Sequence, residues 1–107
     1  MRVKITTFVP EENAELVRRS LGEAGAGLIG EYSYCSFTTM GVGRFTPSSS
    51  ANPHIGAHGI TEMVNEQRIE VVCEKSIAKK VVKVLKKVHP YEEVAFDIVP
   101  LLDESDL

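Results

Sequence analysis

Residues 76–100 read SIAKKVVKVLKKVHPYEEVAFDIVP. In the first half of this stretch, apolar residues recur at the spacing of one helix face and lysines fill the opposite face. Pro90 disfavours helical geometry at His89, so the helix must end there. The alternation of residues 94–99 then predicts a strand. A helix that passes directly into a strand is typical of the last α–β step of a small sheet packed on helices.

The two faces of this predicted helix are chemically distinct, and Ser76 is a candidate N-cap because its hydroxyl could accept a hydrogen bond from the first turn. The face expected to be buried contains Ile77, Ala78, Val81, Val82, Leu85 and Val88. The face expected to be solvated contains Lys79, Lys80, Lys83, Lys86 and Lys87. A solvated helix face is the simpler interpretation of the lysines, and an electrostatic patch for an acidic partner is the alternative.

The N-terminal half repeats the same pattern of strand, helix and strand. Residues 3–9 alternate as a half-buried strand does, and Pro10 followed by two glutamates suits the start of a helix. The predicted helix buries a stripe at spacings of three, four and three, and Gly25-Ala26-Gly27 ends it. That stripe is Ala14, Val17, Leu21 and Ala24.

The middle of the chain is predicted as two strands separated by a long loop. Residues 28–40 have the isoleucine, tyrosine, phenylalanine and threonine content of a strand. Residues 39–59 are rich in glycine, serine and proline and are expected to form the loop. Residues 62–74 return to alternation. Loops of this length in compact domains are often functional.

The resulting order is β-α-β-β-α-β over one domain, residues 1–107. It predicts an α+β, ferredoxin-like fold with a four-stranded antiparallel sheet and both helices on one face. Apolar residues occur on both faces of the predicted strands, for instance Phe96 and Ile98 against Val99. Two helices cover only one face, so we expect the other to pack against a second subunit in a homo-oligomer.

Composition restricts the class of protein. A net charge of −3 argues against a nucleic-acid-binding protein, which normally shows a basic face. No apolar run approaches the roughly 20 residues that cross a bilayer, and the N-terminus lacks the apolar core of a signal peptide. Cys35 and Cys73 are then expected to be reduced thiols in a cytoplasmic protein without a membrane segment.

The first candidate site is the turn that contains Gly41, Gly43, Arg44 and Thr46. Glycines allow the backbone to approach a ligand closely, and Arg44 could pair with an anion in a bidentate manner. The simpler interpretation is a bend or bulge at a strand end with Arg44 solvated, since a single G-x-G without a following helix or lysine is a weak phosphate signal.

A second candidate is a divalent-metal site at His54 and His58, completed by Glu62, a cysteine or a residue of a neighbouring subunit. Neutral imidazoles are common metal ligands. Two histidines without a fixed third ligand are not a site, so two exposed loop histidines remain the simpler interpretation.

The third candidate is His89 followed by Tyr91 and Glu92. A histidine near a carboxylate could be an acid–base pair. The alternative is that His89 lies in the last helical turn, Tyr91 packs against an edge and the glutamates face water. The candidate ligand-binding residues are therefore Gly41, Gly43, Arg44, Thr46, His89, Tyr91 and Glu92.

Several ordered motifs resemble the YqfO-type insert domain of the Nif-three-like dinuclear-metal proteins. They are residues 30–37 (GEYSYCSF), 41–47 (GVGRFTP), 52–56 (NPHIG), 68–70 (RIE) and 89–97 (HPYEEVAFD). The resemblance covers nearly the whole chain and implies an insert domain standing alone. The module is similar in fold to the trimeric CutA and PII signalling proteins.

This resemblance implies a trimer that binds metal ions or small anionic ligands between subunits. The two-metal site of the larger family lies in flanking domains, so neither a dinuclear centre nor hydrolase activity is carried over. We expect a non-enzymatic ligand- or metal-binding regulatory module. The alternatives are a metal-dependent hydrolase using His54, His58 and Glu62, and a structural interaction domain that docks through its lysine-rich helix.

Overall fold

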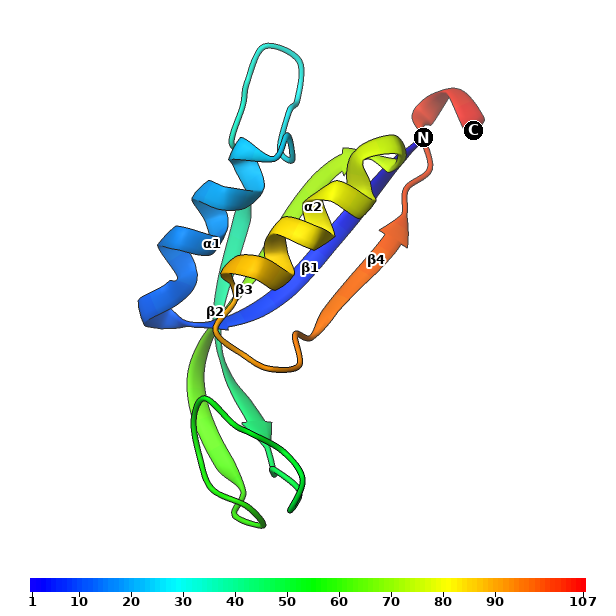
Figure 1. Cartoon of the computed structure of the whole chain (residues 1–107). Helices are drawn as coiled ribbons and strands as arrows, with labels where there is room; N and C mark the ends of the chain where they lie inside the picture. Colours follow the sequence, from blue (N-terminus) through cyan, green and yellow to red (C-terminus); the bar gives the residue numbers. More distant parts are fainter.

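A computed structural model describes all residues, 1–107, and contains six main elements followed by one short helical turn (Figure 1). In chain order they are β1 (Arg2–Pro10), α1 (Glu11–Glu23), β2 (Phe37–Phe45), β3 (Glu62–Glu74), α2 (Lys75–Val88), β4 (Phe96–Pro100) and the 3-10 turn η1 (Glu104–Asp106). This order is the predicted one.

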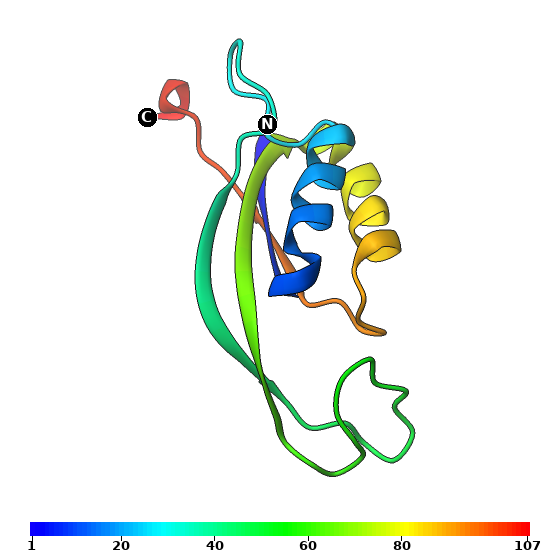
Figure 2. The same ribbon diagram turned by 90° about the vertical axis from the view of Figure 1, so that its left-hand side faces the viewer.

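The four strands form one sheet in the order β2-β3-β1-β4, and every neighbouring pair is antiparallel. Both helices lie on one face of this sheet, as Figure 2 shows. The predicted α+β, ferredoxin-like architecture is therefore confirmed.

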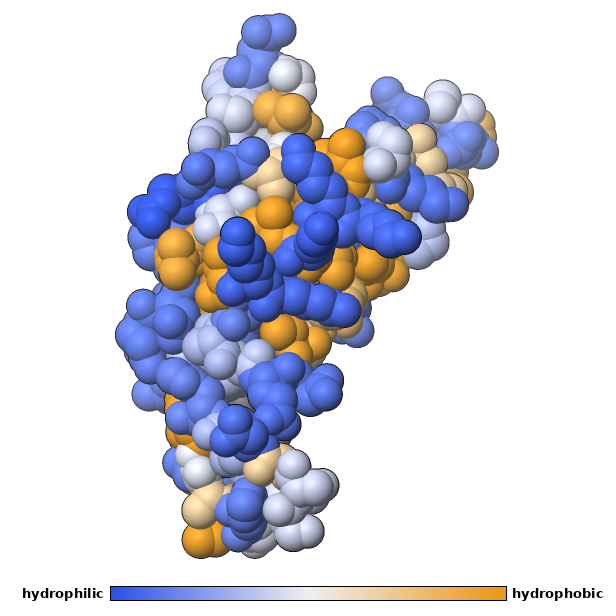
Figure 3. All heavy atoms as spheres, in the orientation of Figure 1, coloured by the Kyte–Doolittle hydropathy of each residue, from blue (hydrophilic) through white to orange (hydrophobic).

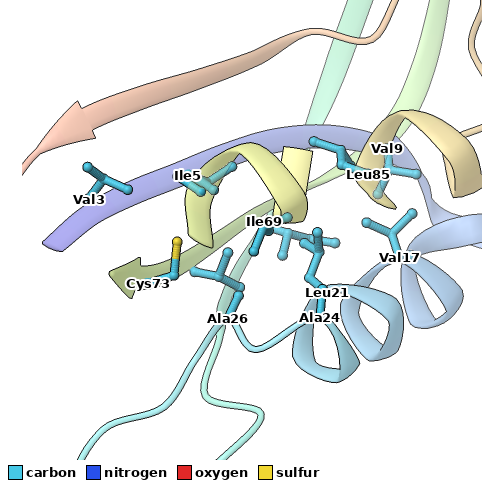
Figure 4. Packing of buried hydrophobic residues seen from close by; sticks show 14 residues of the cluster. Val3, Ile5, Val9, Val17, Leu21, Ala24, Ala26, Ile69, Cys73 and Leu85 are labelled. Atoms are coloured by element: carbon cyan, nitrogen blue, oxygen red, sulfur yellow. The ribbon is translucent and has the colours of Figure 1, made fainter. Parts of the chain in front are cut away.

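The hydrophobic core lies between the helices and the facing side of β1 and β3 (Figure 4). Val3 is opposite Cys73 and Ile5 is opposite Val71, so these pairs share the face that meets the helices. The predicted stripes are also buried: Val17 and other members on α1, and Ala78, Val81 and Leu85 on α2. The periodic spacing of apolar residues in the sequence thus predicted the core correctly.

The prediction for residues 28–40 was wrong in its boundaries. Residues 28–36 form a projecting turn, closed by a single bridge between Ile29 and Tyr32, and β2 begins only at Phe37. The strand continues through the glycine-rich segment to Phe45, so the connecting loop is residues 46–61 rather than 39–59. Pairing with the long strand β3 overrides the weak strand propensity of Gly41 and Gly43.

Two details at the ends of α2 and β4 also differ from expectation. Ser76 does not cap α2, because the helix starts at Lys75 and has no side-chain cap. The backbone N–H of Lys75 instead donates to the carbonyl of Met1 at 2.8 Å. Strand β4 begins at Phe96 rather than at residue 94. The residue before it, Ala95, is held against β1 because its carbonyl accepts a hydrogen bond from Thr7 Oγ1 at 2.9 Å.

The face of the sheet away from the helices is more polar than the sequence suggested. Its centre carries Glu70, which pairs with Lys4 at 3.7 Å and with Arg68 at 3.4 Å. Exposed apolar side chains flank this ion-pair group, with Phe37 on one edge strand and Val99 on the other. A uniform apolar surface for a second subunit is therefore not present.

The lysine face of α2 is exposed as predicted, and hydrophilic side chains spread across the helix side of the molecule in Figure 3. None of its lysines forms an ion pair within the chain, and Lys86 lies over the ring of Phe96 at 5.5 Å. None of the helices is long and apolar enough to cross a membrane.

Candidate functional site

A cavity of about 620 Å³ lies where three segments meet: the end of β2, the 46–61 loop and the α2–β4 connection. The pairing of β1 with β3 ends at Pro10, which is opposite Glu66. The rest of the β2–β3 hairpin therefore projects past the helices (Figures 1 and 2). The predicted residues that line the cavity are Gly43, Arg44, Thr46, His54, Tyr91 and Glu92.

His89 does not line the cavity but packs against Tyr91, which does. The residue adopts an extended conformation just after α2, so it is not in the last helical turn as expected, and its side chain is buried. Its Nε2 is 2.7 Å from the Phe8 carbonyl, and its Nδ1 accepts the backbone N–H of Tyr91 at 3.1 Å. This pattern requires a neutral ring with the proton on Nε2, and burial lowers the pKa of His89 accordingly.

Tyr91 lines the cavity and contacts two other aromatic rings. Its ring packs at 5.0 Å from the ring of His89 and edge-on at 5.7 Å from that of Phe45. Its hydroxyl donates to Glu66 Oε2 at 2.7 Å. Burial and then the adjacent Glu66 carboxylate raise the pKa of Tyr91, so the phenol remains a hydrogen-bond donor.

Glu66 explains why the hairpin contains a glycine at position 43. The Glu66 side chain is only 8% exposed, and its carboxylate lies against the backbone of Gly43. A Cβ at position 43 would overlap the Glu66 carboxylate, whereas a Cβ at Gly41 would meet open space. Gly43 therefore leaves the space that the Glu66 carboxylate occupies, and its backbone angle is not unusual.

Polar contacts hold the 46–61 loop over the cavity. Glu92 is exposed, as expected, and its carboxylate also accepts the backbone N–H of Asn52 at 2.9 Å. At the base of the loop, the hydroxyls of Thr46 and Thr61 lie 2.8 Å apart. The loop is thus attached to the rest of the molecule by a few hydrogen bonds.

The charges around the cavity do not favour a simple anion. Arg44 is the only lysine or arginine in the lining, whereas Glu66, Glu92 and Glu93 contribute three carboxylates. Gly41 lies outside this cavity, in an adjoining hollow of about 190 Å³ that shares Gly43 and Glu66 with it. The glycine-rich turn is therefore a strand segment beside an acidic cavity, not a phosphate loop.

The candidate metal residues do not form a site within one chain. No three His, Cys, Asp or Glu side chains are placed to hold a metal ion. His54 lies over the Tyr91 ring at 6.4 Å, His58 Nε2 lies 2.8 Å from the Ala51 carbonyl, and Glu62 packs beneath Gly56. A hydrolase centre built from His54, His58 and Glu62 gains no support from this arrangement.

Sequence reasoning missed Glu66, Phe45 and Phe8, all of which line the cavity. Glu66 occurs in an alternating strand, where a glutamate is normally read as solvated. The register that pairs Glu66 with Gly41 brings it to the glycine-rich part of β2. No local pattern in the sequence reveals that register.

No family model matches the chain. Among curated proteins, a GTP cyclohydrolase 1 type 2 homolog of Bacillus subtilis is 51% identical over 98 residues, which are 92% of this chain and 26% of that protein. The corresponding homolog of Halalkalibacterium halodurans is 46% identical over 103 residues, 96% of this chain and 28% of that protein. A solved Bacillus cereus protein related to NIF3 matches 95% of this chain and 26% of its own, with 44% identity and a TM-score of 0.83.

The chain is a homologue of one module of the NIF3-related proteins. It spans about a quarter of the length of the curated relatives it matches. The resemblance to the Nif-three-like family is confirmed for this module. The periplasmic divalent cation tolerance protein CutA of Archaeoglobus fulgidus matches 94% of the module and 84% of its own chain, with a TM-score of 0.69 and 19% identity. That likeness shows the shared fold.

Proposed function

We propose that the NIF3-related module is a non-enzymatic, cytoplasmic ligand-binding module with a regulatory role, and that its ligand occupies the cavity beneath the 46–61 loop. The observation that carries the proposal is the convergence of three segments on one cavity of ligand size. Its walls combine the rings of Phe45 and Tyr91 with a few polar groups, among them Arg44 and Glu66. Cavities of this size and composition are the usual sites of small ligands.

The hydrogen bonds of Tyr91, which lines the cavity, and of the adjacent His89 favour binding over catalysis. Both ring nitrogens of His89 are occupied by backbone groups, so this imidazole is not free to act as a general base. The raised pKa of Tyr91 keeps its hydroxyl protonated, so no phenolate is available to act as a base. Cys35 and Cys73 are not in the lining, so the cavity also lacks a thiol nucleophile.

The regulatory role follows from the way the loop is attached. A ligand in the cavity would contact the loop and the α2–β4 connection simultaneously, because residues of both line it. Binding would then favour the arrangement in which Glu92 holds Asn52. The position of the loop would in this way depend on whether ligand is bound in the cavity, and in a larger NIF3-related protein other domains could respond to that position.

Thermal unfolding with a panel of nucleotides, divalent metals and small aromatic cations and anions tests this function. GTP belongs in the panel because the relatives bear the name GTP cyclohydrolase 1 type 2 homolog. A ligand that binds only the native state must raise the Tm, and Tyr91→Ala should abolish the shift. Tyr32→Ala is the matched control, since Tyr32 is 75% exposed and outside the cavity. No shift with any member of the panel would contradict the proposal.

We also infer that the module self-associates, and the family resemblance makes a trimer the expected form. Support comes from the projecting hairpin, where Val42 and Met63 are more than half exposed. A neighbouring subunit could then supply the ligands that His54, His58 and Glu62 lack for a divalent metal. Native mass spectrometry tests this directly: a trimer with a reproducible metal mass supports it, and a monomer at micromolar concentration contradicts it.

A further inference from the structure

The cavity contains a buried carboxylate that the chain itself only half satisfies. Glu66 is more than nine-tenths buried, and its Oε2 accepts the Tyr91 hydroxyl. Its Oε1 has no hydrogen-bond partner, and no lysine, arginine or histidine forms an ion pair with it. Oδ1 of Asn13 is the only fully buried side-chain atom without a partner, so Glu66 Oε1 is accessible from outside, and Glu66 lines the cavity.

The position of this carboxylate follows from Gly43. Because Gly43 has no side chain, the Glu66 carboxylate can occupy the space beside it. Gly43 and Glu66 line the 620 Å³ cavity and the adjoining 190 Å³ hollow. A carboxylate held in an apolar setting is stabilised by charge-assisted hydrogen bonds from N–H donors. Two further carboxylates, Glu92 and Glu93, line the same cavity and increase its negative potential.

The cavity that Glu66 lines also has an aromatic lining. Phe8, Phe45 and Tyr91 line the cavity together with Glu66. Aromatic faces attract both flat rings and cations. The site therefore presents one strong acceptor beside flat apolar surfaces, with a single cation, Arg44, in its lining.

We propose that the cavity takes a small organic ligand with a flat apolar body and an amidine-type edge of N–H donors, and that this edge binds the Glu66 carboxylate. This inference rests on the proposed binding function and names the ligand class. An amidine offers two adjacent N–H groups: one can donate to the free Oε1, and the other can share Oε2 with the Tyr91 hydroxyl. Anionic ligands such as phosphate would meet three carboxylates and are disfavoured.

Benzamidine and benzoate form a matched pair of probes, because both are flat, ring-bearing molecules of similar size and opposite charge. Titration followed by two-dimensional NMR gives their affinities and the residues that shift. Benzamidine should bind about tenfold or more tighter than benzoate, with shifts at Phe45, Glu66 and Tyr91. Equal affinity, or tighter benzoate binding, would overturn the inference.

Glu66→Gln keeps the shape of the side chain and removes its charge, so it should abolish the preference for benzamidine. Gly43→Ala provides a second test, since the added methyl displaces the carboxylate without altering its chemistry. Glu31→Gln, at an exposed glutamate outside the cavity, is the control and should retain the preference. An unchanged preference in Glu66→Gln would refute the role of this carboxylate.

The two proposals fail in distinguishable ways. If benzoate or a nucleotide binds in the cavity and benzamidine does not, the ligand class is wrong and the binding function stands. If neither the probes nor any member of the ligand panel binds, both proposals are refuted.

Discussion

The half of the sheet beneath the helices and the half that projects beyond them are held together by different forces. Beneath the helices, side chains such as Ile5, Leu21 and Leu85 are completely buried in one hydrophobic cluster. In the projecting hairpin, Val42 and Met63 are exposed, and the contacts that order the loop are individual hydrogen bonds. The first half should unfold as a cooperative unit, and the second should open locally at lower free energy.

This contrast places the candidate site at the border between a rigid and a compliant region. Tyr91, which lines the cavity, and the adjacent His89 are attached to the core by short hydrogen bonds, Tyr91 to β3 and His89 to β1. The opposite side of the cavity is the 46–61 loop, which is held by a few hydrogen bonds. A site of this construction can admit a ligand without disrupting the fold, because only the loop has to move.

The largest expected effect is a cavity in the helix-covered half. Leu85→Ala should lower the free energy of unfolding by about 2–5 kcal/mol, because Leu85 is 0% exposed and its side chain fills the core. Leu28→Ala is the matched control, since Leu28 is 61% exposed and should change stability by less than about 0.5 kcal/mol. Urea unfolding followed by circular dichroism measures both, and similar losses would contradict the proposed core.

His89→Ala tests the link between the two halves. The substitution leaves the Phe8 carbonyl and the Tyr91 N–H without their partner and should lower the free energy of unfolding by about 2 kcal/mol at pH 7.5. It should also increase amide exchange in residues 46–61, because Tyr91 loses its support. Amide hydrogen exchange measures that effect, and an unchanged loop would separate His89 from the site.

The pH dependence of stability provides an independent readout of His89. Burial places its folded-state pKa below the ordinary value of 6.5, so the unfolded chain binds more protons on this residue in mild acid. Its contribution is complete above pH 6.5 and is lost as the pH falls towards the lower folded-state pKa. From pH 7.5 to 5.5, the native chain should lose more stability than His89→Ala, and parallel urea titrations check this difference.

The sequence was sufficient to predict the helix-covered half. Spacings of three and four residues identified the stripe of Leu21 and that of Leu85, and Pro90 marked the end of α2. These signals are local, since each depends on neighbours within a few turns of the chain. The order of elements, and therefore the sheet topology, followed from them.

The cavity could be predicted only in part, because it depends on register. Gly43, Arg44 and Tyr91 were candidates from their residue type alone. Glu66 was not, since only the pairing of β2 with β3 shows that a glutamate meets a glycine there. The extent of β2 was missed for the same reason: a long partner strand extends a segment whose own composition resembles a loop.

Gly43→Ala and Gly41→Ala form a pair that measures this packing. The added methyl at position 43 overlaps the Glu66 carboxylate and should lower the free energy of unfolding by about 1.5 kcal/mol. At position 41 the methyl meets open space, and the change should be neutral or slightly stabilising. Thermal unfolding of both variants measures the difference, and equal Tm values would contradict close packing between Gly43 and the Glu66 carboxylate.

The smallest effect is expected for Tyr91→Phe, which removes only the hydroxyl that donates to Glu66. The loss should be about 1 kcal/mol in the free energy of unfolding, because Glu66 can turn towards water in the open cavity. Tyr32→Phe is the control, since its hydroxyl has no partner and its side chain is 75% exposed. A loss in Tyr91→Phe as large as that of His89→Ala would mean that the hydroxyl, rather than the imidazole, joins the projecting half to the core.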